Sequence, residues 1–226
     1  MLHATTPPDK NDAFVTKLLD KLKAEFEPEL VPIRPEPYAK SLNCFANVME
    51  KVKRDGGRIH YGWAIHKTTI LCEAERHAVW EDEQEEFTDI TPTEVQAEHT
   101  LFVSDHEGFE YTGQDTDNVR INITGNPVVD DFIRVNETLS KIHAYGTRAD
   151  DMYMQLPDAA MELHQYYDAL KNVLQGFIYM GGTPKKHCLC KGPDRYRNCH
   201  GKSIGPRIKA DLRQLKTFLG EPGRSA

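Results

Sequence analysis

Apolar residues recur at helical spacing along much of the chain, and each stripe predicts an amphipathic helix. Five segments follow this pattern: residues 11–27, 41–55, 127–145, 157–180 and 208–219. In the second segment the apolar stripe consists of Phe45, Val48, Met49 and Val52. The two glycines at 56–57 should end that helix, because glycine is favoured just beyond a helix C-terminus.

Alternating or β-rich patterns between the second and third helices predict a sheet. Strands are expected at residues 58–65, 70–81 and 86–90, and two further strands at 99–105 and 118–124. Residues 27–37 read EPELVPIRPEP, and their four prolines predict an extended connector rather than a regular element. Helices followed by strands and then by helices indicate an α+β fold.

Length and composition suit one medium domain, or one domain with a small appendage. The chain has 226 residues, of which 39% are hydrophobic and 28% are charged. No apolar run approaches the roughly 20 residues that a membrane span requires. The first residues, MLHATTPPDKND, lack the charged and then apolar pattern of an export signal, so we expect a cytoplasmic protein.

Charge is distributed unevenly. Residues 183–216 contain ten Lys and Arg against two Asp, a net charge of +8, so the rest of the chain is net −15. A basic tail of this kind can bind an acidic protein, the ribosome or RNA, or an anionic lipid. It can also be a solvated surface, or it can dock on the acidic remainder of the same chain.

The most compact motif is CLCKGPDRYRNCH, at residues 188–200. Thiolates and imidazole are the ligands that tetrahedral zinc prefers, and four of them lie within this stretch: Cys188, Cys190, Cys199 and His200. The neighbouring His187 is a competing ligand. Four protein ligands would close the site to substrate, so the sequence predicts a structural rather than a catalytic zinc.

This spacing resembles the SEC-C zinc motif, which occurs at the C terminus of the SecA preprotein translocase motor and as an appendage on many bacterial proteins. The similarity extends to Tyr196, three residues before the third cysteine, and to Gly201 after the histidine. It departs at 191–193, where Lys-Gly-Pro replaces the usual Gly-Ser-Gly. The resemblance implies use as an adaptor that binds a partner.

A second set of reactive side chains lies in the first half of the chain. Cys44 falls at the start of the second predicted helix, after the N-cap candidates Ser41 and Asn43, where the helix dipole favours a thiolate. His77 lies on a predicted strand. If the following hairpin turns at residue 83, Asp89 is the direct cross-strand partner of His77. The alternative for His77 is a half-exposed or hydrogen-bonded histidine without a chemical role.

Cysteine at a helix start, then histidine and aspartate on neighbouring strands, resembles the catalytic core of the papain-like and transglutaminase-like superfamily. Residues 41–92 carry the resemblance, through NCFANVMEKVKRDGG, HAVW and TDITP. It implies a nucleophile helix packed on a small antiparallel sheet. It also implies that Cys44 is the nucleophile, that His77 is the general base and acid, and that Asp89 orients the imidazole.

The stretch PYAKSLN lacks the glutamine that papain-type enzymes place before the cysteine. The backbone amide of Cys44 could supply one oxyanion-hole donor, and the side chain of Asn43 or Asn47 another. Trp63 is either a core residue or part of the cleft wall.

These patterns predict three parts: a papain-like or transglutaminase-like domain at 1–150, a helical connector at 151–182, and a basic zinc appendage at 183–226. The complete Cys-His-Asp set favours a cysteine hydrolase or acyl transferase that acts on a peptide, isopeptide or other amide bond. The alternative is a non-enzymatic, zinc-bearing adaptor module on an inactive scaffold of the same fold.

Overall fold

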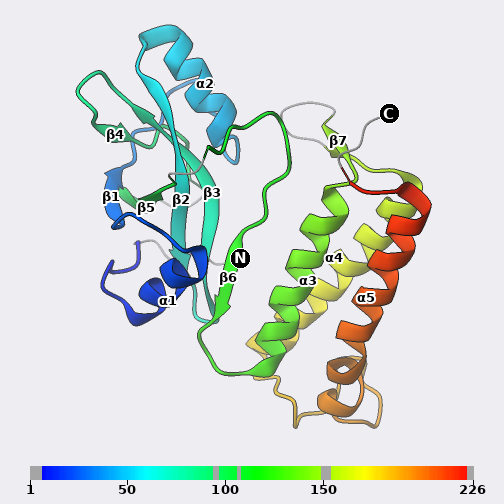
Figure 1. Ribbon diagram of the computed structural model, residues 1–226. Helices are drawn as coiled ribbons and strands as arrows, with labels where there is room; N and C mark the ends of the chain where they lie inside the picture. The colour runs from blue at the N-terminus through cyan, green and yellow to red at the C-terminus, as the bar shows by residue number, and fades with distance from the viewer. Residues whose placement is uncertain (1–6, 94–96, 106–107, 149–153, 223–226) are drawn as a thin grey trace. The chain divides into compact units, whose positions relative to one another are not determined.

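The computed structural model describes residues 7–93, 97–105, 108–148 and 154–222 (Figure 1). The chain forms two compact units. Unit 1 comprises Met1–Gly113 and Asp117–Ile123, and unit 2 comprises Gln114–Thr116 and Thr124–Ala226. Among the described residues, no helix is both long and apolar enough to cross a membrane.

Unit 1 is built on an antiparallel sheet with the strand order β1-β5-β2-β3-β4. Strand β6 also pairs with β3, at a different stretch of that strand from β4. The strands are β1 (Glu29–Pro32), β2 (Arg58–Lys67), β3 (Leu71–Glu81), β4 (Phe87–Thr88), β5 (His99–Ser104) and β6 (Val119–Asn122). The two ends of this path meet, because Ile33 and Asp89 form a parallel bridge. The Arg34 amide donates to the Asp89 carbonyl oxygen at 2.8 Å. The sheet therefore curls until its outer strands touch.

Two helices cover one face of this sheet. Helix α1 (Ala13–Leu22) packs Val15 and Leu18 against Ile65, Cys72 and Ala74 of the sheet. Helix α2 (Cys44–Asp55) packs Val48 against Ala78 and Ile90. The opposite face encloses a second apolar cluster of Val31, Val79 and Phe102. The predicted helix on a small antiparallel sheet, and the α+β class, are confirmed.

The end of α2 depends on its two glycines. Both have positive φ, 78° at Gly56 and 74° at Gly57. A Cβ atom on Gly57 would lie 2.3 Å from the carbonyl oxygen of Glu81, so only glycine fits there. The Trp80 indole donates to the Gly56 carbonyl oxygen at 3.0 Å, which ties the end of the helix to β3.

Several sequence-based boundaries differ from the structure, three of them for reasons that the structure shows. The expected proline-rich connector contains β1, because Pro28 precedes this strand and Pro32 ends it, positions that a strand tolerates. The first helix ends at Leu22 rather than at 27, since Lys23 adopts a left-handed conformation. The last helix begins at His200, eight residues earlier than expected, with Pro206 inside it.

Unit 2 contains α3 (Pro127–His143), α4 (Asp158–Tyr179) and α5 (His200–Leu219), with the short pair β7 (Thr147–Arg148) and β8 (Met154–Gln155). A single 3-10 turn, Tyr196–Asn198, precedes α5. The buried stripe of α3 packs against α4 and α5, and α3 belongs to unit 2 together with the cysteine-rich loop.

Candidate active site and metal centre

Cys44 is the first residue of α2, and its side chain is buried at the helix start. Asn43 is the N-cap residue, but its side chain makes no capping bond to the described first turn. The residue before it, Leu42, has a φ of 63°, an uncommon conformation for a bulky side chain. Leu42 is also 74% exposed, so core packing does not explain this conformation.

His77 and Asp89 form a direct, nearly buried pair. His77 Nε2 lies 2.9 Å from Asp89 Oδ2, and the side chains are 12% and 3% exposed. Cys44 lines the same cleft as this pair. Burial alone would lower the pKa of His77, but the charges of Asp89 and Cys44 raise that pKa well above its ordinary value. The three predicted residues therefore come together at one cleft.

Asp89 reaches His77 from a different register than expected. Strand β4 pairs Trp80 with Thr88 and Glu81 with Phe87, which aligns position 89 with Val79 rather than with His77. The cause is the turn, where the Asp82 carboxylate accepts hydrogen bonds from the amides of Gln84 at 2.9 Å and Glu86 at 3.0 Å. A shift of two residues keeps the side chain on the same face, so Asp89 meets His77 diagonally.

A cleft of about 390 Å³ opens onto this group, and its lining includes Cys44, His77 and Asp89. Leu42 and Ile33 supply apolar walls, and Glu75 supplies a carboxylate. In the described residues this lining leaves out Asn43, Asn47 and Trp63. Trp63 instead stacks with the Arg76 guanidinium, 3.9 Å from the ring centroid, and packs against the α1 cluster.

Asn47 is held by partners of its own. Its Nδ2 donates to the Lys40 carbonyl oxygen at 2.8 Å and to Thr91 Oγ1 at 3.2 Å, and its Oδ1 accepts from the Lys40 amide at 3.0 Å. Thr91, which the sequence did not single out, donates its amide to Asp89 Oδ1 at 2.9 Å. Its spacing of two residues from Asp89 is the signal that could have indicated this contact.

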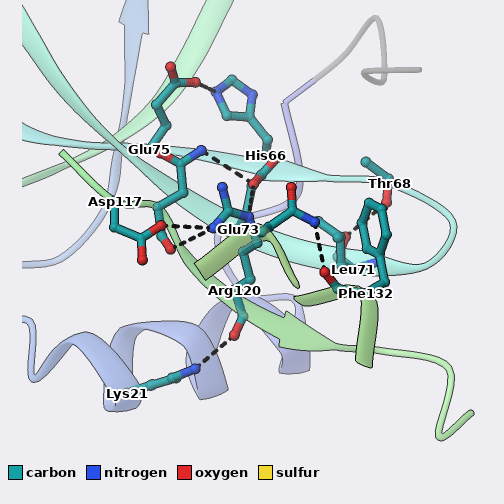
Figure 2. A network of polar contacts seen from close by, with 11 residues as sticks. Lys21, His66, Thr68, Leu71, Glu73, Glu75, Asp117, Arg120 and Phe132 are labelled. Carbon is teal, nitrogen blue, oxygen red and sulfur yellow. Dashed lines mark hydrogen bonds and ion pairs between the residues drawn. The ribbon is translucent and has the colours of Figure 1, made fainter. Parts of the chain in front are cut away.

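The two glutamates on the face of His77 have different environments (Figure 2). Glu73 is 2% exposed and accepts from Nε of Arg120 on β6 at 3.0 Å, so it joins two strands. Glu75 lines the cleft, and its Oε2 lies 3.6 Å from Nε2 of His66, a residue for which no role was predicted.

The four predicted metal ligands cluster in unit 2. Ligand atoms of Cys188, Cys190, Cys199 and His200 all lie within 4.8 Å of one another. Cys190 Sγ and Cys199 Sγ are 3.8 Å apart, and Cys199 Sγ is 3.5 Å from His200 Nδ1. A tetrahedral zinc separates two sulfurs by about 3.8 Å and a sulfur from a nitrogen by about 3.5 Å. The residues therefore fit zinc. His187, which forms a backbone β-bridge with Arg195, is not in the cluster.

Tyr196 anchors the metal loop to the helices. Its hydroxyl donates to Asp131 Oδ2 of α3 at 2.8 Å, and its ring stacks on Phe177 of α4 at 5.4 Å. Burial raises the pKa of Asp131, although the bond from Tyr196 opposes that shift. A Cβ atom on Gly201 would lie 2.8 Å from the Tyr196 ring, so this glycine permits the close approach.

The ten basic residues of 183–216 are all exposed. Arg207 Nε lies 3.4 Å from Asp211, and Lys216 pairs with Glu221. Part of the positive charge is therefore balanced locally, while most of it faces solvent around the metal loop and along α5.

Comparisons with protein-family models, with curated proteins and with solved structures gave no match for this chain.

Proposed function

We propose that unit 1 is a thiol-dependent hydrolase or acyl transferase that acts on a peptide, isopeptide or other amide bond. The observation that carries this proposal is that Cys44, His77 and Asp89 line one cleft, with His77 bonded to Asp89 at 2.9 Å. A nucleophile, a base and an orienting carboxylate gathered in one site are what covalent acyl transfer requires. The order of helix, histidine strand and aspartate residue also supports the papain-like and transglutaminase-like assignment.

In the proposed reaction the Cys44 thiolate attacks the carbonyl carbon of the amide. The C–N bond then breaks, the amine leaves with a proton from the His77 imidazolium, and a thioester remains on Cys44. Water or an acceptor amine attacks this thioester and gives its proton to His77. The S–C bond breaks, which restores the thiolate and the imidazolium.

We propose that the two ring nitrogens of His77 have different roles in this reaction. Because Nε2 of His77 binds Asp89, Nδ1 is the nitrogen left to exchange a proton with Cys44. The backbone amide of Cys44, in the first turn of α2, lacks an acceptor within the helix and is our proposed oxyanion donor. Asn47 is excluded from that role in our proposal, because its amide hydrogens are already directed to Lys40 and Thr91.

The test is acylation by p-nitrophenyl acetate. We expect a rapid first release of nitrophenol and an acetyl group on Cys44, found by peptide mass mapping. Cys44→Ala should remove both signals, whereas Cys72→Ala should keep them, because burial raises the pKa of Cys72 to about 12 and prevents its reaction. Absence of acetyl on Cys44 in the folded protein would contradict the proposal.

Zinc is the proposed resident metal of unit 2, held by Cys188, Cys190, Cys199 and His200. With four protein ligands, it would stabilise the loop between α4 and α5 rather than take part in a reaction.

The second candidate function is a zinc-bearing adaptor that binds an acidic partner. It is supported by the exposed basic residues along α5, including Lys202, Lys209 and Arg213. A triple change of these three residues to glutamate should abolish binding to an acidic peptide or to RNA, and the wild-type affinity should fall steeply with salt. Unchanged binding by the folded triple variant would exclude this surface.

A further inference from the structure

Two buried polar residues connect the Cys44 loop to Asp89, and neither belongs to the proposed triad. We propose that Asn47 and Thr91 are positioning residues, which fix the Cys44 thiol and the Asp89 carboxylate in one frame. This inference rests on the function proposed above. It replaces the oxyanion role that the sequence suggested for Asn47.

Asn47 closes the loop that delivers the nucleophile. Its carboxamide both accepts from the Lys40 amide at 3.0 Å and donates to the Lys40 carbonyl oxygen at 2.8 Å. The paired bonds hold both backbone polar groups of Lys40, the amide and the carbonyl, so the chain between 40 and 47 forms a closed turn. Within this turn lies Leu42, whose positive φ is held at a cost of about 1 kcal/mol or more. Such a conformation persists where surrounding contacts enforce it, and Asn47 supplies those contacts.

Thr91 extends the link to the carboxylate. Its Oγ1 accepts from Asn47 Nδ2 at 3.2 Å, and its amide donates to Asp89 Oδ1 at 2.9 Å. The other oxygen of Asp89 lies 2.9 Å from His77 Nε2. Each carboxylate oxygen therefore has a separate partner, and the carboxylate cannot rotate without losing one of them. The result is one continuous path from the Cys44 loop through Asn47, Thr91 and Asp89 to His77.

Burial makes this path rigid. Asn47 and Thr91 are each 5% exposed, and Asp89 is 2% exposed. Water cannot easily replace a lost partner at this depth, so each bond constrains the geometry more than it would at the surface. Misplacement of a reacting group by about 1 Å can lower a rate by about a hundredfold. A link that sets the distance between thiol and imidazole therefore bears directly on reactivity.

The experiment compares matched variants at Thr91 and Asn47. Thr91→Val keeps the shape and the amide bond to Asp89 but removes the acceptor for Asn47, whereas Thr91→Ser retains that acceptor. Asn47→Ala removes the whole link. The readout is the second-order rate of Cys44 alkylation by iodoacetamide against pH, measured by peptide mass mapping, with the fold checked by circular dichroism.

We expect Thr91→Val to lower the Cys44 rate near neutral pH by about tenfold and to move the profile toward that of an ordinary thiol. Thr91→Ser should retain the wild-type profile, and Asn47→Ala should cause the larger loss. A folded Thr91→Val variant with an unchanged profile would overturn the positioning role. If wild-type Cys44 itself reacts like an ordinary thiol, the proposed function fails instead, so the two failures are distinguishable. Should Asn47→Ala not fold, the valine and serine pair still decides.

Discussion

The two candidate sites are assembled from very different lengths of chain. The metal cluster takes its four ligands from the thirteen residues 188–200 of unit 2. The Cys44, His77 and Asp89 group takes its members from a helix start, a central strand and the residue that follows β4 in unit 1. A local site depends on its ligand spacing and its metal, whereas a dispersed site depends on strand register and on packing between elements.

The first consequence concerns loss of the metal, which should have the largest effect. Binding of a structural zinc contributes on the order of 10 kcal/mol, so Cys199→Ser should release about one zinc per chain and unfold the loop before α5. Elemental analysis and hydrogen exchange over residues 186–199 measure the two effects. Cys44→Ser is the control and should retain the zinc. An ordered loop in protein without stoichiometric metal would contradict the assignment.

Next in size is the anchor of the metal loop. Tyr196→Phe leaves the buried Asp131 carboxylate without its hydroxyl donor and should reduce the free energy of unfolding by about 1–3 kcal/mol. The matched control is Tyr167→Phe, which removes a 2.8 Å bond to the more exposed Asp211. Its effect should be about 1 kcal/mol or less. Chemical denaturation of the zinc-loaded protein measures the free energy of unfolding of the two variants. Equal losses of stability in both would show that the burial of Asp131 is unimportant.

The dispersed site predicts a pH effect instead. Because the pKa of His77 is raised on folding, its contribution to stability is complete below the ordinary histidine pKa of about 6.5. That contribution is lost as pH rises through the raised value. Each unit of difference corresponds to about 1.4 kcal/mol. Cys44→Ala removes one group that raises the pKa of His77, so an NMR titration of His77 should move to lower pH. A titration that stays in place would show that the thiol does not act on the imidazole.

The smallest effect is expected at Leu42. Leu42→Gly relieves the strain of the positive φ at this exposed residue. The free energy of unfolding should therefore stay the same or rise by at most about 1 kcal/mol. Leu42→Ala keeps the strain and serves as the control, with no such gain. Thermal unfolding resolves the difference. A glycine variant less stable than the alanine variant would show that the conformation is not strained.

The same contrast explains what the sequence could predict. Ligand type and spacing sufficed for the metal cluster, and apolar periodicity sufficed for α2, β2 and β3. The proximity of His77 and Asp89 was confirmed, but the expected register was wrong, because side-chain bonds of Asp82 move the turn. Pro206 concealed the start of α5, since a proline inside a helix normally indicates a break.

The roles of Asn47 and Trp63 depend on tertiary partners that lie far away in the sequence. Asn47 bonds Thr91, 44 residues later, and Trp63 stacks with Arg76 of the neighbouring strand. Helical spacing placed Asn47 near Cys44 but could not tell whether its amide faced the cleft or the core.

The most direct test of the central claim is the pH dependence of Cys44 alkylation in wild type and in His77→Ala. Iodoacetamide should modify Cys44 faster than Cys72 in the same sample, since Cys72 is fully buried. The Cys44 rate should remain high below neutral pH, and His77→Ala should remove this low-pH reactivity while circular dichroism and zinc content stay unchanged. If Cys44 reacts like an ordinary thiol and does not respond to the loss of His77, the histidine is structural and the proposed enzyme is contradicted.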